Sequence, residues 1–197
     1  MSDRPTNPKY DRLISPRTRY VLVTGGRGSG KSDAVALGAC GEMTLLEDWV
    51  ILYTRWTLTS AEISIIPEFQ KKIDLLGKRD KVKVSGNIVH SKETGSRIIF
   101  SGIKAASGTQ TARLKSIEGL NKLIVEEAEE FRYETEFNTL DDSIRVPGVP
   151  NIVIIVMNPQ DVDHWIWQRW FAKSHRMEII DGVQIPISTH PEITHIH

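Results

Sequence analysis

The sequence predicts an α/β fold, with a parallel-centred sheet that is flanked by helices and extended by short antiparallel strands. Three observations lead to this prediction. Short apolar runs alternate along the chain with segments of helical character. A glycine-rich loop lies between the first apolar run and the first helical segment. The 197 residues are 40% hydrophobic and 25% charged, which suits one globular domain with a packed core.

The glycine-rich loop is the most specific feature of the chain. Residues 25–32 read Gly-Gly-Arg-Gly-Ser-Gly-Lys-Ser, which is the pattern of a phosphate-binding loop. The apolar run 20–23 precedes the loop and the helical run 34–40 follows it. Glycines let backbone N–H groups turn toward a phosphate, and the start of the helix adds a positive dipole. A glycine-rich turn without a ligand is the alternative, and the flanking strand and helix argue against it.

Within the loop, Lys31 is expected to reach the β- and γ-phosphates of ATP, and the Ser32 hydroxyl to hold Mg²⁺. The predicted fold is therefore a P-loop NTPase, and the predicted cofactors are ATP and Mg²⁺. Tyr20, with Arg17 and Arg19, is a candidate to stack on the adenine, although solvated arginines beside an edge tyrosine are an equal alternative. The nucleotide-binding residues predicted in the loop are Gly25, Gly26, Arg27, Gly28, Ser29, Gly30, Lys31 and Ser32.

The remaining elements follow from hydrophobic periodicity and turn residues. Two or three short antiparallel strands are predicted between residues 81 and 100, and residues 104–116 form a long polar loop. Helices are predicted at 31–46, 58–76, 133–144 and 161–173, with Pro67 as a possible kink in the second. The other predicted strands are 19–24, 50–53, 122–125, 152–157, 177–180 and 183–187.

The second half of the site is predicted at two other strand ends, because ligands of parallel sheets bind at the carboxyl ends of the strands. Glu126 and Glu127 follow a buried strand, and we assign Glu126 to the magnesium shell, through water, and Glu127 to the attacking water. Their alternative role, shared by Glu129 and Glu130, is an acidic first turn of a helix. Asn158 follows the most apolar strand and is a candidate sensor of the γ-phosphate.

Composition excludes several classes of protein. The single cysteine, Cys40, excludes an internal disulfide and reads as a small buried residue. No apolar run approaches the length of a membrane span, so no membrane association is expected. Residues 1–120 carry 19 Lys and Arg against 12 Asp and Glu, whereas residues 121–197 carry 6 against 13. This asymmetry disfavours a uniformly basic DNA-coating protein, and leaves open one phosphate-contacting face or a fluctuation without meaning.

Taken together, these segments resemble the ATPase domain of the large terminases of tailed phages, the motors that package DNA. The stretches that carry the resemblance are 25–32, 100–104, 115–119, 125–129 and 157–159, in an order and spacing that run through about residues 19–160. The resemblance implies ATP hydrolysis coupled to translocation of double-stranded DNA into a procapsid. It also implies a ring of subunits on a portal protein, a small terminase subunit as partner, and work in the cytoplasm of the host cell.

The resemblance also assigns further candidates and domain limits. Arg27 matches the loop arginine of the family, and Arg55, Arg113 and Lys115 are candidates for a finger that acts in trans or for DNA contacts, with a solvated surface as the alternative. Many members carry Asp at the position of Glu126. Residues 1–18 are expected to be a lead-in, 19–188 the ATPase domain, and 189–197 a tail toward a nuclease domain. The isolated domain is expected to be a monomer.

Other polar and aromatic groups are expected to be structural. Asp141, Asp142, Asp161 and Asp163 read as helix-start and surface residues, and His190, His195 and His197 as part of a disordered tail. Some of Trp165, Trp167, Trp170 and Phe171 are expected to pack in the core. The competing functions are a helicase-like or other DNA-dependent P-loop ATPase and a slow nucleotide-binding assembly module; a small-molecule kinase fits less well, because adjacent glutamates favour activation of water.

Overall fold

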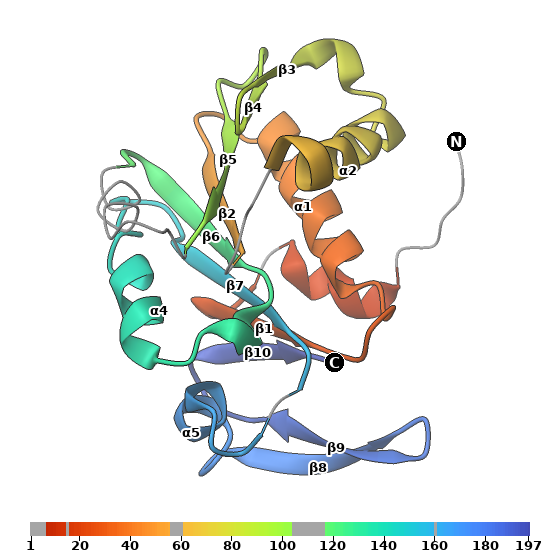
Figure 1. Cartoon of the computed structure of the whole chain (residues 1–197), viewed down its shortest axis with the longest axis vertical. Coiled ribbons are helices and arrows are strands. Elements are labelled where there is room, and N and C mark those ends of the chain that lie inside the picture. The colour runs from red at the N-terminus through yellow and green to blue at the C-terminus, as the bar shows by residue number, and fades with distance from the viewer. Residues whose placement is uncertain (1–6, 15, 56–60, 104–116, 160) are drawn as a thin grey trace.

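The computed structural model describes residues 7–14, 16–55, 61–103, 117–159 and 161–197 (Figure 1). In these residues, eight strands form a central sheet in the order β10-β1-β7-β6-β2-β5-β4-β3, and two form a separate hairpin. The strands of the sheet are β1 (Tyr20–Thr24), β2 (Val50–Arg55), β3 (Val82–Ser85), β4 (Ile88–Ser91), β5 (Arg97–Gly102), β6 (Leu120–Val125), β7 (Ile152–Met157) and β10 (Ile193–Ile196); β8 (His175–Ile180) and β9 (Val183–Ser188) form the hairpin.

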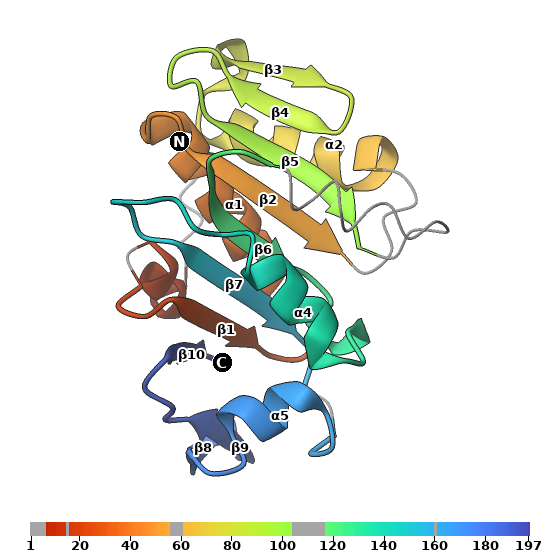
Figure 2. The same cartoon turned by 90° about the vertical axis from the view of Figure 1, so that its left-hand side faces the viewer.

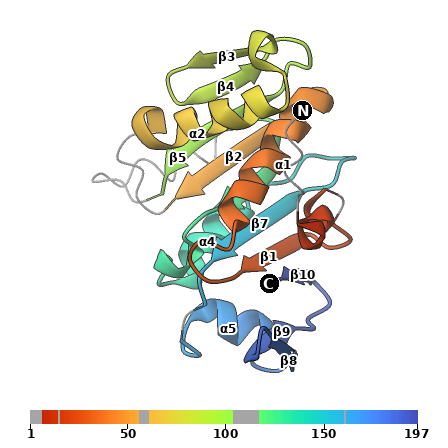
Figure 3. The same ribbon diagram turned by 90° about the vertical axis from the view of Figure 1, so that its right-hand side faces the viewer.

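Helices cover both faces of the sheet. Figure 3 shows α1 and α2 over one face, and Figure 2 shows α4 and α5 over the other. In the part of the chain that the structure describes, no helix has both the length and the hydropathy that a membrane span requires. The helices are α1 (Lys31–Leu45), α2 (Ala61–Leu75), α4 (Glu134–Asp141) and α5 (Trp165–Trp170), with short 3-10 turns η1 (Pro8–Leu13), η2 (Arg79–Lys81) and η3 (Ala128–Glu130).

The sheet is parallel at its centre and antiparallel at one edge, which confirms the predicted fold class. β10, β1, β7, β6, β2 and β5 run parallel, and β4 and β3 extend the sheet antiparallel. One detail of the prediction was wrong, because β5 belongs to the parallel part: it pairs with β2 in parallel and only its other edge faces β4. The helix α2 lies in the crossover between β2 and β5, and such a crossover is what parallel pairing requires.

The central strands β1, β2, β6 and β7 are buried on both sides, which explains their largely apolar sequences. In β1, Val21 and Val23 pack into the core beneath α1 and α2, whereas Tyr20 and Leu22 pack into the core beneath α4 and α5. The expectation that some tryptophans pack in the core is confirmed, since Trp165 and Trp170 are buried in that second core. Cys40 is also buried as expected, and burial raises the pKa of its thiol to about 12.

The helices differ from the predictions mainly at their ends. α1 matches its predicted range closely, and α2 continues as one helix through Pro67. The helix predicted at 161–173 is shorter, because His164 caps the N-terminus of α5 by accepting the N–H of Ile166, 3.3 Å away, and Phe171 leaves helical geometry. Asp161 and Asp163 precede this cap and are exposed, as expected for surface residues.

Both ends of the described chain pack on the edge of the sheet beside β1, which contradicts the predicted lead-in and tail. In η1, Tyr10 and Leu13 join the core beneath α1 and α2. β10, predicted as part of a tail, pairs in parallel with β1 through Tyr20 to Val23, and all four of its residues are buried. The two ends also meet directly, because the Arg12 guanidinium donates to the carbonyl of His195 at 3.0 Å.

The burial of His195 in β10 shows why the tail prediction failed. Its Nδ1 accepts the N–H of Ser188 at 3.0 Å, and its Nε2 lies 2.8 Å from the hydroxyl of Thr24. Burial lowers the pKa of His195 to about 3, so the ring is neutral and Nε2 carries the proton that is donated to Thr24. Thr24 also lies 2.8 Å from Nδ1 of His197. Polar residues can therefore form a buried edge strand because each finds a partner.

Candidate nucleotide-binding site

The loop from Gly25 to Ser32 connects the end of β1 to the start of α1, as the sequence predicts (Figure 3). Gly30 caps the helix with a left-handed backbone, φ 80° and ψ 7°, which strongly favours glycine. At Gly25, an added Cβ would lie 2.8 Å from Oγ of Ser29, so a side chain would collide with the loop itself. The glycines thus allow a closely folded loop at the N-terminus of α1, where backbone N–H groups can bind an anion.

Lys31 points back into this loop and is only 8% exposed. Its ammonium donates to the carbonyl of Gly26 at 3.1 Å and to Oδ1 of Asn158 at 2.9 Å. Asn158 follows the end of β7, so this second bond joins the loop to a neighbouring strand of the sheet. Both acceptors are uncharged oxygens, which hold the ammonium in place without neutralising its charge. The lysine is therefore prepared to bind an anionic group in the loop.

Glu126 lies directly after β6 and is 3% exposed. Its Oε2 accepts the hydroxyl of Ser32 at 3.0 Å, and its Oε1 accepts the hydroxyl of Tyr53, on β2, at 2.7 Å. Burial raises the pKa of this carboxyl, and the two hydroxyl donors and the charge of Arg55 oppose that rise. Ser32 and Glu126 thus form a pair of oxygen donors, the ligand type that Mg²⁺ prefers.

This donor pair fits Mg²⁺ better than it fits a metal that needs a cage made entirely of protein. Mg²⁺ commonly uses one or two protein oxygens and fills its other positions with water and substrate phosphates. Among the residues that the structure describes, no three or more His, Cys, Asp and Glu side chains gather into a metal-binding cluster.

Glu127, the next residue, has a different environment. It is exposed and adopts a left-handed backbone, φ 52° and ψ 43°, at the start of η3. This conformation is unfavourable for a residue with a side chain and tends to persist where function requires it. Side chains of successive strand residues point to opposite faces, and this conformation breaks that alternation. Glu126 can therefore point inward, while Glu127 is exposed at the carboxyl ends of the strands.

Two residues of this site were not predicted from the sequence. Tyr53 holds Glu126, and the only signal in the sequence is a hydroxyl in an otherwise apolar strand. Glu129 was interpreted as part of an acidic helix start, but its carboxylate accepts the side-chain amide of Asn158 at 2.7 Å and the backbone N–H of Asn158 at 3.3 Å. Asn158 itself follows the end of β7, as the sequence predicts, and its contact with Lys31 is found only in the structure.

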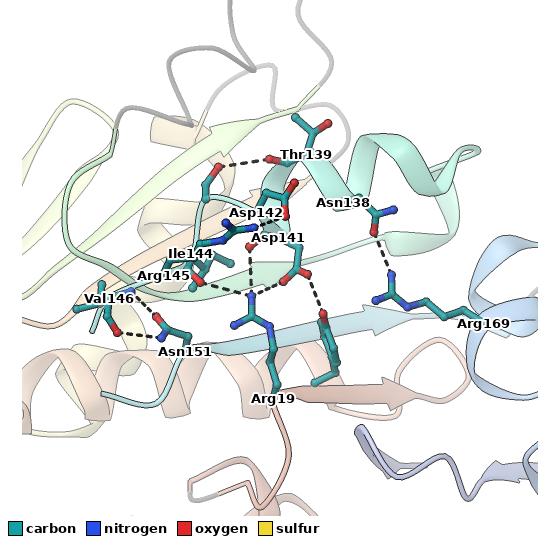
Figure 4. Close-up of polar contacts among 12 residues, drawn as sticks. Arg19, Asn138, Thr139, Asp141, Asp142, Ile144, Arg145, Val146, Asn151 and Arg169 are labelled. Carbon is teal, nitrogen blue, oxygen red and sulfur yellow. Dashed lines mark hydrogen bonds and ion pairs between the residues drawn. The ribbon is translucent and has the colours of Figure 1, made fainter. Parts of the chain in front are cut away.

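Tyr20 is not available to stack on a nucleotide base, so that prediction was wrong. It is the first residue of β1, at the opposite end of the strand from the loop, and its ring packs against Phe137 and Trp170. The Tyr20 hydroxyl donates to Oδ2 of Asp141 at 2.7 Å, and Arg19 donates to Oδ1 of the same carboxylate at 2.7 Å. Figure 4 shows Arg19 reaching toward Asp141 and Ile144.

The same contacts correct the prediction for Asp141. It lies at the C-terminal end of α4, not at a helix start, and its side chain is only 14% exposed. Asp142, by contrast, is 70% exposed and pairs with Arg145 at the surface, as expected (Figure 4). We call Arg19, Tyr20 and Asp141 the amino-end cluster, because they lie at the amino end of β1.

Of the four basic residues proposed as fingers or DNA contacts, the structure describes two, Arg27 and Arg55. Arg27 is exposed in the loop. Arg55 is the last residue of β2 and lies, like Glu126, at the carboxyl ends of the parallel strands. Nε of Arg55 is buried, and within the described ranges it has no hydrogen-bond partner. Its positive charge lowers the pKa of Glu126, although burial of that carboxyl has the larger, opposite effect. Arg113 and Lys115 lie outside the described residues.

Comparisons with known proteins identify a sequence relative and several proteins of similar fold. The PBSX phage terminase large subunit of Bacillus subtilis (strain 168) is 27% identical over 176 residues, which are 88% of this chain and 39% of that protein. The large terminase of a thermophilic bacteriophage, also solved with ADP and with ATP-γ-S, has a TM-score of 0.67 at 14% identity. That match covers 84% of this chain and 42% of the thermophilic-phage chain.

A solved ATPase domain also shares the fold. The ATPase domain of the Thermus phage P74-26 large terminase has a TM-score of 0.64 at 16% identity, over 95% of this chain and 78% of that chain. Identities this low show the shared fold alone, and this chain spans less than half the length of the PBSX protein and of the terminase solved with ADP. The family model of the phage terminase large subunit matches residues 17–190, which is most of the 197 residues, and the chain therefore belongs to that family.

Proposed function

We propose that the chain is the ATPase domain of a viral DNA-packaging motor, which hydrolyses ATP to drive double-stranded DNA into a procapsid. One observation carries this proposal: the ends of β1, β6 and β7 bring Lys31, Ser32, Glu126 and Asn158 into one hydrogen-bonded site. Membership of the terminase family and the ADP and ATP-γ-S complexes of the thermophilic-phage terminase support ATP as the ligand.

Each residue of the site has a role that its position supports. The loop N–H groups and the Lys31 ammonium bind the phosphates, and Ser32 and Glu126, the latter partly through water, would hold Mg²⁺. Bound Mg²⁺ offsets the charge that develops on the β- and γ-phosphates. Glu127 orients the attacking water and removes its proton, because its carboxylate lies at the open edge of the sheet, where water has access. Asn158 senses the γ-phosphate through its contact with Lys31.

The whole motor requires partners beyond this chain. We propose that subunits form a ring on the portal protein, with the small terminase subunit and double-stranded DNA as partners, in the host cytoplasm. The domain alone is proposed to be a monomer. Arg27 is exposed in the loop and is available to contact the γ-phosphate in cis, whereas Arg55 stays a candidate from the sequence for a finger in trans or a DNA contact. Arg113 and Lys115 stay candidates from the sequence.

Single-turnover hydrolysis of ATP, with and without linear double-stranded DNA, tests the proposal. Wild-type protein is expected to bind ATP with Mg²⁺ and to hydrolyse it, and Lys31→Ala to abolish hydrolysis and weaken binding. Lys83→Ala is a matched control, since Lys83 is exposed on β3 at the far edge of the sheet. Unchanged turnover in Lys31→Ala would show that ATP is not hydrolysed at this site. Slow turnover that ignores DNA would favour an assembly module, whereas DNA stimulation without packaging would favour a helicase-like ATPase.

A further inference from the structure

A chain of hydrogen bonds runs from Glu129 through Asn158 to Lys31. The Glu129 carboxylate accepts two N–H groups of Asn158, one from the side-chain amide at 2.7 Å and one from the backbone at 3.3 Å. The amide oxygen of Asn158 in turn accepts the Lys31 ammonium at 2.9 Å. We propose that Glu129 is a positioning residue of the ATPase site, which acts on Lys31 through Asn158; this inference rests on the proposed function.

The negative charge of Glu129 decides which way the Asn158 amide faces. Because the amide nitrogen donates to the carboxylate, the amide oxygen is directed to the other side, toward the lysine. A flipped amide would place its oxygen against the carboxylate and its NH₂ group against the ammonium, and both contacts would be repulsive. Without Glu129, only the Lys31 ammonium would favour one of these two orientations over the other.

This arrangement keeps Lys31 charged and correctly placed at the same time. A carboxylate in direct contact with the ammonium would form an ion pair and compete with a phosphate for the lysine. In the structure, the neutral amide of Asn158 stands between the two charges. Glu129 therefore fixes the direction of the lysine while the positive charge stays available to the substrate.

The same carboxylate connects the lysine to the water-orienting glutamate. Glu127 and Glu129 belong to one short turn, in which the N–H of Glu130 donates to the carbonyl of Glu127 at 2.9 Å. Ala128, between them, is buried in the core beneath α4 and α5 and anchors the turn. The position of Asn158 is thus tied through Glu129 to the backbone that carries Glu127. Glu129 sets the position of Lys31 relative to Glu127.

The variant Glu129→Gln tests this role with little change in shape. Glutamine offers one acceptor in place of two, and its NH₂ group would oppose one of the N–H groups of Asn158. We expect kcat for ATP hydrolysis to fall about tenfold, the usual effect of losing a charge-assisted hydrogen bond. Affinity for ADP, measured with a fluorescent analogue, and the thermal midpoint should stay unchanged. Glu130→Gln is the matched control, since Glu130 is the exposed neighbour in the same turn, and it should behave as wild type.

A double mutant separates a positioning role from a merely structural one. If Glu129 acts through Asn158, Glu129→Gln should cost little further activity in an Asn158→Ala background, so the two effects should not add. Additive effects, or wild-type kcat in Glu129→Gln, would overturn the inference while leaving the ATPase proposal intact. Failure of the wild-type protein to bind or hydrolyse ATP would instead reject the proposed function itself.

Discussion

Polar clusters lie at the two ends of β1, and they differ in how their charged groups are held. In the amino-end cluster, opposite charges are in direct contact, with Arg19 and Asp141 2.7 Å apart (Figure 4). At the carboxyl end, the charged groups are held by neutral ones: Lys31 by amide and carbonyl oxygens, and Glu126 by two hydroxyls. One cluster is neutralised from within, and the other retains charges for a ligand to neutralise.

The raised pKa of Glu126 shows that the cluster at the carboxyl end of β1 lowers the stability of the fold. Burial raises that pKa, so the ionised carboxylate is less favourable in the folded chain than in the unfolded one. The free energy of unfolding should therefore decrease as the pH rises from the ordinary value of 4.5 through the raised pKa. A cation bound beside Glu126 would offset this cost. The ionised carboxylate of Glu126 thus lowers the stability of the carboxyl end, whereas the Arg19–Asp141 pair contributes stability at the amino end.

The largest effect is expected from Glu127→Gln, which alters the carboxyl end without touching its buried charges. Hydrolysis should fall about 10²-fold or more, the usual contribution of a positioned base. Nucleotide binding and thermal stability should stay close to wild type, because the side chain of Glu127 is exposed. Rapid-quench measurement of a single turnover, with fluorescence titration of ADP, checks both parts. A loss of binding with unchanged chemistry would mean that Glu126 and Glu127 have exchanged roles.

Smaller effects are expected from Glu126→Gln, which should impair the use of Mg²⁺ and at the same time raise the thermal stability. The Mg²⁺ concentration needed for half-maximal hydrolysis should rise about tenfold or more, since a group that holds the metal loses its charge. Without ligand at neutral pH, the thermal midpoint should rise, because the variant no longer buries an ionised carboxylate. Calorimetry with and without Mg²⁺–ATP measures both. A variant that is less stable than wild type would show that Glu126 is a structural residue.

The smallest effect is expected from Asp141→Ala, at the other end of β1. It removes the partner of Arg19 and Tyr20, and the loss of stability should be about 1 kcal/mol, because the 35% exposed side chain of Arg19 is partly screened by water. kcat should not change. Asp142→Ala is the matched control, since that side chain is 70% exposed and should have no measurable role. Denaturant unfolding, compared with hydrolysis, tests the prediction, and a fall in kcat would disprove the separation of the two ends.

The positions of the candidate site residues could be predicted, because spacing and strand ends depend on local sequence. The pattern Gly25 to Ser32 specifies a loop whose geometry only glycines permit, and the apolar strands before Glu126 and Asn158 place both at one edge of a parallel sheet. The role of Glu129 could not be predicted, because a carboxylate at a turn has the same sequence pattern whether it faces solvent or Asn158.

By itself, the sequence determined the fold class, the glycine-rich loop and the strand ends that carry Glu126 and Asn158, since hydrophobic period and glycine positions act over a few residues. Only the tertiary structure decided that Tyr20 is buried with Asp141, that residues 193–196 form the edge strand of the sheet, and that Tyr53 and Glu129 hold the site. Those outcomes depend on partners 29 to 173 residues apart, which meet only when the sheet has assembled.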